Sequence, residues 1–104
     1  MAGREPRLSK QGLVVLHLFL ARPTVALAGS DITKAAGLFS GTVYQILFRL
    51  ERAGWLTSEW EQVEPNEIGR PRKRLYRLTA LGERKSRAAL SELGLSSGRL
   101  AWNF

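Results

Sequence analysis

Two short amphipathic segments on either side of a glycine, within residues 29–54, constrain the fold of this chain most. In the second segment apolar side chains share one face of a helix, and polar or basic ones lie opposite. The apolar positions are Val43, Ile46, Leu47 and Leu50. We expect a short helix capped by Gly29 or Ser30, a left-handed residue at Gly37 and a second helix capped by Ser40. This order predicts a helix-turn-helix, with an ordinary helical hairpin as the alternative.

The segment after Gly54 predicts a two-stranded hairpin with a basic tip. Residues 55–64 are rich in strand formers, residues 65–71 hold the Pro, Asn and Gly of a loop, and residues 72–79 resume as a strand. Eight of the 16 Lys and Arg residues lie in residues 68–87. A helix-turn-helix followed by a basic hairpin is a winged helix, so we expect an α+β, mainly α fold. Tyr76 and Leu78 should anchor the hairpin, or wing, to the core.

The N-terminal segment predicts a helix from a cap at Ser9 to about Ala21, where Pro23 stops it. This helix is apolar almost all round, which is typical of a helix that packs against apolar surfaces on two sides, here its own core and a second subunit. His17 is expected to be a core or interface histidine. We expect a homodimer with Leu13, Leu16 and Leu20 near the two-fold axis.

The C-terminal segment predicts a helix capped by Thr79, with Leu81, Ala88 and Leu93 as its apolar positions. We expect residues 1–79 to form the winged-helix DNA-binding domain, residues 80–93 a dimerisation helix and residues 94–104 a tail. Trp102 in that tail either docks on the partner subunit or belongs to a frayed terminus.

Charge and composition exclude several classes of function. A net charge of +7 and a pI of about 10.8 favour a polyanionic partner, nucleic acid first and anionic membrane second. The longest apolar stretch, residues 13–21, is about half of the roughly 20 residues that a membrane span needs. With no Cys, one His and one Asp, the sequence predicts no disulfide, catalytic triad, metal site or cofactor. We expect a soluble, cytoplasmic protein that is not an enzyme.

The acidic residues of the first hairpin strand form no metal site on this interpretation. Glu59, Glu61 and Glu64 are expected to be a solvated acidic face that keeps one side of the wing away from phosphate.

The exposed positions of the second helix suit DNA recognition. Gln45 can bond adenine in two places, Arg49 and Arg52 can reach guanine or phosphate, and the helix N-terminus at Gly41 can hold a phosphate. Tyr44 either bonds a phosphate or packs against the hairpin, and Arg49 could instead pair with an acid. The expected DNA contacts are Lys34, Ser40, Gly41, Thr42, Tyr44, Gln45, Arg49 and Arg52 from the helix-turn-helix, and Arg70, Arg72, Lys73 and Arg74 from the wing.

Two runs, SGTVYQILFRLERAGWLTSEWE and GRPRKRLYRLTALGE, carry a family resemblance. The first contains T-x-Y-x-x-L-x-R-L-E-x-x-G-x-L-x-S, from Thr42 to Ser58, and the second contains G-R-x-R-K-x-x-Y-x-L-T-x-x-G, from Gly69 to Gly82. Over about 55 residues the chain therefore resembles the PadR family of bacterial winged-helix transcriptional regulators. Members often have a longer C-terminal helical region for dimerisation, whereas this chain has a single short helix there.

The resemblance implies a sequence-specific regulator of transcription that binds double-stranded DNA. We expect it to be a repressor that acts as a homodimer on a roughly palindromic site. A weakly specific architectural DNA binder and a winged-helix protein interaction module are the alternatives. A small-molecule effector is left open, because nothing in the sequence supports carrying over the phenolic acids that the family name suggests.

Overall fold

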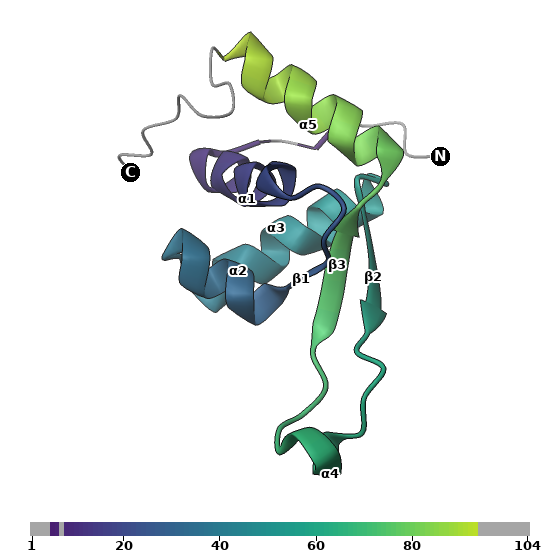
Figure 1. The fold of residues 1–104 in the computed structure, drawn as a ribbon. Helices are drawn as coiled ribbons and strands as arrows, with labels where there is room; N and C mark the ends of the chain where they lie inside the picture. The colour runs from purple at the N-terminus through teal and green to yellow at the C-terminus, as the bar shows by residue number, and fades with distance from the viewer. Residues whose placement is uncertain (1–4, 7, 94–104) are drawn as a thin grey trace.

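A computed structural model describes residues 5–6 and 8–93 of the chain. Its helices and strands follow one another as α1 (Lys10–Ala21), β1 (Leu27–Ala28), α2 (Gly29–Ala36), α3 (Ser40–Arg52), β2 (Leu56–Trp60), α4 (Pro65–Ile68), β3 (Arg74–Leu78) and α5 (Ala80–Glu92). The helices α1, α2, α3 and α5 gather at one end, and a long hairpin extends from them (Figure 1). The fold is a winged helix, and it is α+β with mainly helical residues, as the sequence predicts.

Helix α1 begins at the predicted cap, since the hydroxyl of Ser9 accepts a hydrogen bond from the amide of Gly12 at 3.1 Å. Its burial differs from the expectation for a dimer axis. Leu13 is 7% exposed and Leu16 is 0% exposed within the single chain, and Leu16 belongs to its hydrophobic core. These two side chains therefore offer a second subunit almost no surface, whereas Leu20 is only half-buried.

Helices α2 and α3 form the predicted helix-turn-helix around Gly37, which has a φ of 68° and ends α2. The expected caps are wrong by one residue. Ala28 precedes α2 and Phe39 precedes α3, and neither side chain makes a capping hydrogen bond. Ser40 is instead the first residue of α3. The apolar face is confirmed: Val43, Ile46, Leu47 and Leu50 are all buried, and Ile32 of α2 lies in the same core.

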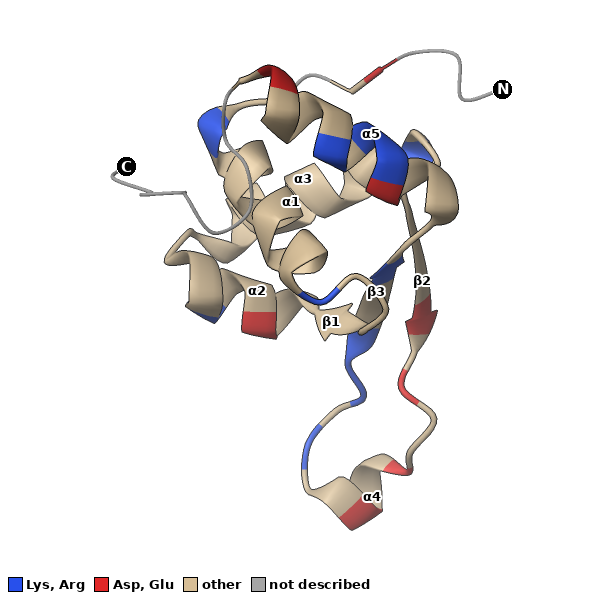
Figure 2. Cartoon of the chain, turned by 45° about the horizontal axis from the view of Figure 1, so that its top comes forward, with Lys and Arg blue, Asp and Glu red and all other residues tan. Residues whose placement is uncertain are grey.

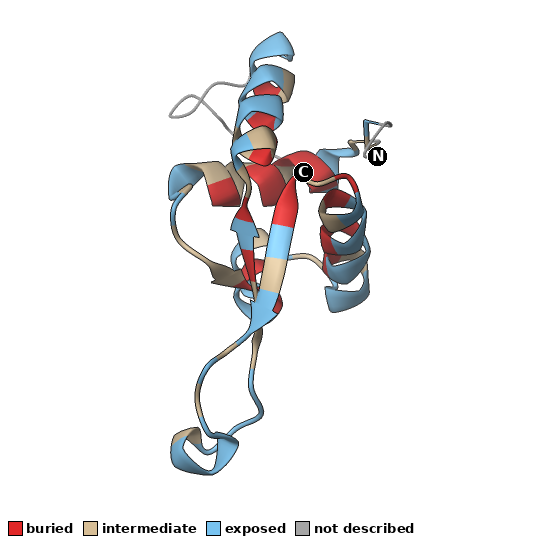
Figure 3. Cartoon of the chain, turned by 90° about the vertical axis from the view of Figure 1, so that its right-hand side faces the viewer, coloured by how far each residue is buried: buried red, intermediate tan, exposed pale blue. Residues whose placement is uncertain are grey.

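The three strands form an antiparallel sheet in the order β1-β3-β2. Strand β3 lies in the middle, with Tyr76 opposite Leu27 of β1 and Leu78 opposite Leu56 of β2. Tyr76 and Leu78 are both buried, so the predicted anchoring of the wing in the core is confirmed. Beyond the sheet the hairpin is exposed, and it contains the short helix α4 where the sequence predicted a loop (Figure 3).

Helix α5 is capped by Thr79, whose hydroxyl accepts from the amide of Gly82 at 2.9 Å. It packs on α1 at the end of the molecule away from the wing (Figure 1). The buried face of α5 carries Gly82, Ser86 and Leu90, whereas Leu93 is 58% exposed. The predicted apolar face is therefore right for Leu81, which packs against the core, and wrong for Ala88 and Leu93, which are exposed. The small residues Gly82 and Ser86, four apart, let the helix lie close to its neighbours.

No helix of the described residues has the length and apolar character that would let it cross a membrane. Charge is separated along the hairpin, with basic residues on the β3 side and acidic residues on the β2 and α4 side (Figure 2). The separation places opposite charges within reach of each other across the wing.

Candidate nucleic-acid interface

The outer face of α3 is exposed and carries no exposed acid. Gln45, Arg49 and Arg52 all lie on it and are exposed, and the guanidinium of Arg52 sits over the ring of Phe48, 5.6 Å from its centre. The one acid of α3, Glu51, is half-buried and accepts a hydrogen bond from the hydroxyl of Ser58 on β2 at 2.6 Å. The face is therefore neutral to basic and can approach a polyanion.

The start of α3 is open to solvent. Ser40 and Gly41 are exposed, and an added Cβ at Gly41 would meet no atom within 4 Å. Thr42 is half-buried, and Lys34 is exposed on the preceding helix. The first amides of a helix have no carbonyl partner within it, so this end of α3 can receive a phosphate oxygen.

Tyr44 packs on the start of α2 and keeps an exposed side. A Cβ built on Gly29 would lie 2.6 Å from the ring and from the hydroxyl oxygen of Tyr44. Glycine at position 29 thus allows the tyrosine ring to lie against the backbone, while the side chain stays 42% exposed. The sequence left Tyr44 between a phosphate contact and packing against the hairpin, and this position combines packing against α2 with a partly exposed side chain.

A groove of about 610 Å³ brings the helix-turn-helix and the wing together. Its walls come from the start of α2, from Tyr44 on α3 and from the returning side of the wing. Its lining includes the four predicted wing residues, Arg70, Arg72, Lys73 and Arg74, together with Trp60. The groove therefore joins one predicted contact of the helix-turn-helix, Tyr44, to the four predicted contacts of the wing.

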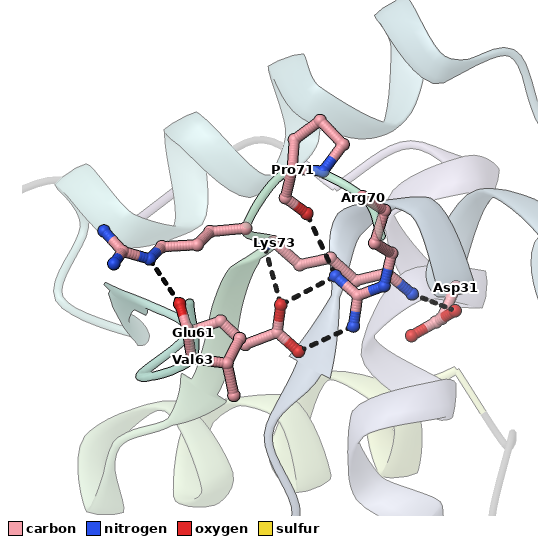
Figure 4. Close-up of polar contacts among 7 residues, drawn as sticks. Asp31, Glu61, Val63, Arg70, Pro71 and Lys73 are labelled. Carbon is pink, nitrogen blue, oxygen red and sulfur yellow. Dashed lines mark hydrogen bonds and ion pairs between the residues drawn. The ribbon is translucent and has the colours of Figure 1, made fainter. Parts of the chain in front are cut away.

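Glu61 holds the side chain of Arg70 at the tip of the wing (Figure 4). Both terminal nitrogens of Arg70 donate to its carboxylate, at 2.8 and 2.9 Å, and the amide of Lys73 donates to it at 3.0 Å. The hydrogen bonds from Arg70 and from the Lys73 amide lower the pKa of Glu61 to about 2. The same carboxylate raises the pKa of Arg70 above its usual value.

Three further contacts restrain the wing. The Nε of Arg72 donates to the carbonyl of Val63 at 2.6 Å, and its guanidinium lies 3.4 Å from the carboxylate of Glu64. The ammonium of Lys73 lies 3.4 Å from the carboxylate of Asp31, which ties the wing to α2 (Figure 4). The expectation of a solvated acidic face is therefore wrong for Glu61, whose side chain is 19% exposed and paired with Arg70, whereas the side chain of Glu64 remains 68% exposed beside Arg72.

Arg74 sits at the root of the wing in a network that the sequence did not indicate. Its Nε donates to the hydroxyl of Ser58 at 3.1 Å, and its guanidinium lies 5.1 Å from the ring centre of Trp60. Ser58 in turn donates to Glu51, so the network joins α3 to both wing strands. The only available signal was the cross-strand register, which pairs Trp60 with Arg74 and which no local pattern specifies.

Together these features define a winged-helix protein in which the exposed face of α3 carries no exposed acid and the wing is basic. Among the described residues no group of His, Cys, Asp or Glu could hold a metal ion. Residues 29–88 match the transcriptional regulator PadR-like family, which is more than half of the chain. The chain belongs to this family of DNA-binding regulators of transcription. No curated protein sequence matches the chain.

Solved structures show the same fold. The chain is similar to MepR of Staphylococcus aureus in a MepR–DNA complex, with 21% identity and a TM-score of 0.66, and the match covers 84% of this chain and 65% of MepR. It is similar to a PadR family transcriptional regulator from Eggerthella lenta, with 25% identity and a TM-score of 0.63, over 83% and 76% of the two chains. A transcriptional regulator homologue from Pyrococcus horikoshii matches at 20% identity and a TM-score of 0.66, over 80% and 75%.

Proposed function

We propose that this protein is a sequence-specific repressor that acts as a homodimer, with α3 in the major groove and the wing along the phosphate backbone. It has no enzymatic activity on this proposal. The observation that carries the proposal is the shared groove between Tyr44 of α3, the start of α2 and the basic side of the wing. A partner that fills this groove contacts both elements at once. A DNA duplex can do so, because its phosphate backbone lies beside the edges of its bases.

The ion pairs of the wing are compatible with phosphate binding. The side chains of Arg70, Arg72 and Lys73 remain 40%, 43% and 32% exposed. Exposed pairs of this kind contribute little to stability, so a phosphate can replace the carboxylate at small cost. The pairs hold the wing in shape until the exchange occurs.

The proposed dimer uses α1 and α5 at the end away from the wing. Leu20 of α1 is half-buried and Leu93 at the end of α5 is exposed, which leaves apolar surface on both helices. The wings and the α3 helices of the two chains would then lie at the end of the dimer opposite the α1 and α5 contact, where they could both bind DNA. Trp102, predicted as a further contact, lies outside the described residues.

Selection of bound duplexes from a random pool tests this proposal. A regulator of the proposed kind should enrich one site with two related half-sites, because the symmetry of the dimer is copied in the DNA. Equal affinity for all duplexes would favour an architectural binder. A lack of DNA affinity at low salt would favour a protein interaction module.

Variants separate positioning from reading. Arg72→Ala should weaken binding to selected and random DNA alike and reduce the slope of log K against log salt by about one for each phosphate that the altered protein no longer binds. Gln45→Ala should weaken binding to the selected site by about 1–3 kcal/mol and leave the salt slope nearly unchanged. The reverse pattern would show that the roles of the wing and of α3 are wrongly assigned.

A further inference from the structure

Phe39 has the most exposed large apolar side chain of the described residues, at 86%. It lies in the turn between α2 and α3, where its carbonyl accepts the hydrogen bond of the Val43 amide and its side chain makes no cap. The residue before it, Leu38, packs against the core. The turn therefore directs Leu38 inward and presents Phe39 at the very start of the recognition helix.

The surroundings of Phe39 favour a nucleic acid over a protein as its partner. It precedes the exposed Ser40 and Gly41, and the exposed side of the helix continues through Gln45 to Arg49 without an exposed acid. A surface that joins an apolar group to basic ones suits the major groove of DNA. Phosphates line that groove, and the C5-methyl of thymine is the apolar group on its floor.

We propose that Phe39 reads the C5-methyl group of one thymine in each half-site of the DNA. This inference rests on the proposed function and deepens it, because it assigns apolar base recognition to a residue outside the polar set on α3. The N-terminal residues of a recognition helix are the ones that reach base edges, and Phe39 directly precedes the first of them. Apolar contact with the thymine methyl is a recognition mode suited to phenylalanine.

The test combines a protein change with a DNA change. Sites selected by the whole protein are resynthesised with each thymine in turn replaced by deoxyuridine, which lacks only the methyl group. At one thymine per half-site the replacement should weaken binding of the unaltered protein about fourfold, the factor expected for one buried carbon group. Phe39→Ala should bind the thymine and deoxyuridine forms equally, and Phe39→Leu should keep most of the difference because it keeps an apolar side chain.

Several results would overturn the inference. It would be overturned by a selected site that contains no thymine. It would also be overturned if deoxyuridine had no effect at any position, or if it weakened binding of the unaltered protein and of Phe39→Ala equally. A dimer that dissociates in Phe39→Ala without DNA would assign the residue to a contact between copies instead. Failure to select any DNA would overturn the proposed function as well, whereas selection without a deoxyuridine effect overturns this inference alone. Loss of folding is not expected, since an exposed side chain leaves no cavity.

Discussion

A very close backbone approach in the fold predicts that Gly82→Ala will destabilise the protein. Gly82 lies in the first turn of α5, directly against the backbone of Trp55. A Cβ at position 82 would lie 2.0 Å from the carbonyl oxygen of Trp55 and 2.7 Å from its carbonyl carbon. Because real Cβ atoms do not approach closer than 3.0 Å, the start of α5 must move by about 1 Å.

The cost follows from the contacts that this movement disturbs. Overpacking of this kind costs about 1–3 kcal/mol. The shift also strains the cap at Thr79, whose hydroxyl accepts from Gly82 at 2.9 Å and whose amide donates to Trp55 at 3.0 Å, and removal of a cap costs about 1 kcal/mol. The better helix propensity of alanine returns about 1 kcal/mol. We therefore expect a net decrease of about 2 kcal/mol in the free energy of unfolding.

Urea denaturation followed by the fluorescence of the buried Trp55 would measure this decrease. Gly41→Ala is the matched control, because the same change in α3 meets no atom within 4 Å. It should leave stability unchanged or raise it by up to about 1 kcal/mol, since alanine favours the helix. A Gly82→Ala protein as stable as its Gly41→Ala counterpart would refute the packing of α5 described above.

Three further predictions concern the wing, its root and the dimer. Glu61 has a folded pKa of about 2, below its ordinary 4.5, so its stabilisation of the wing is complete above pH 4.5 and is lost as the pH falls through 2. The NMR chemical shift of the Lys73 amide should therefore titrate near pH 2, and this step should be absent in Glu61→Gln. A midpoint near 4.5 would contradict the contact. Glu51→Ala should lower the free energy of unfolding by about 1.5 kcal/mol in urea because it removes the charged acceptor of Ser58, and Glu51→Gln by less. Leu93→Glu should shift sedimentation from dimer to monomer without lowering the melting temperature, because Leu93 is exposed in the single chain; an unchanged dimer would argue against an interface at α5.

Most of the fold was predicted from local patterns in the sequence. The period of Val43, Ile46 and Leu47 predicted the buried face of α3, and Gly37 predicted the turn before it, because both depend on residues close in the chain. The exposed residues of α3 followed from the same period. The basic cluster between Arg70 and Arg74 predicted the wing for a similar reason, since charge in a hairpin loop is a local property of the sequence.

Contacts between distant residues were decided by the tertiary structure. The strand register brings Arg70 onto Glu61 and Arg74 onto Trp60, and pairing across a hairpin cannot be deduced from the charge of either strand alone. Which residues of α1 are free for a second subunit also depended on packing, because a helix that is apolar all round does not show which side its own core will cover. The sequence by itself determined the helix-turn-helix and its basic wing, since periodicity and charge are local. Only the tertiary structure decided which of those charges are already paired and that Leu16 belongs to the core, because burial and pairing are properties of the folded chain as a whole.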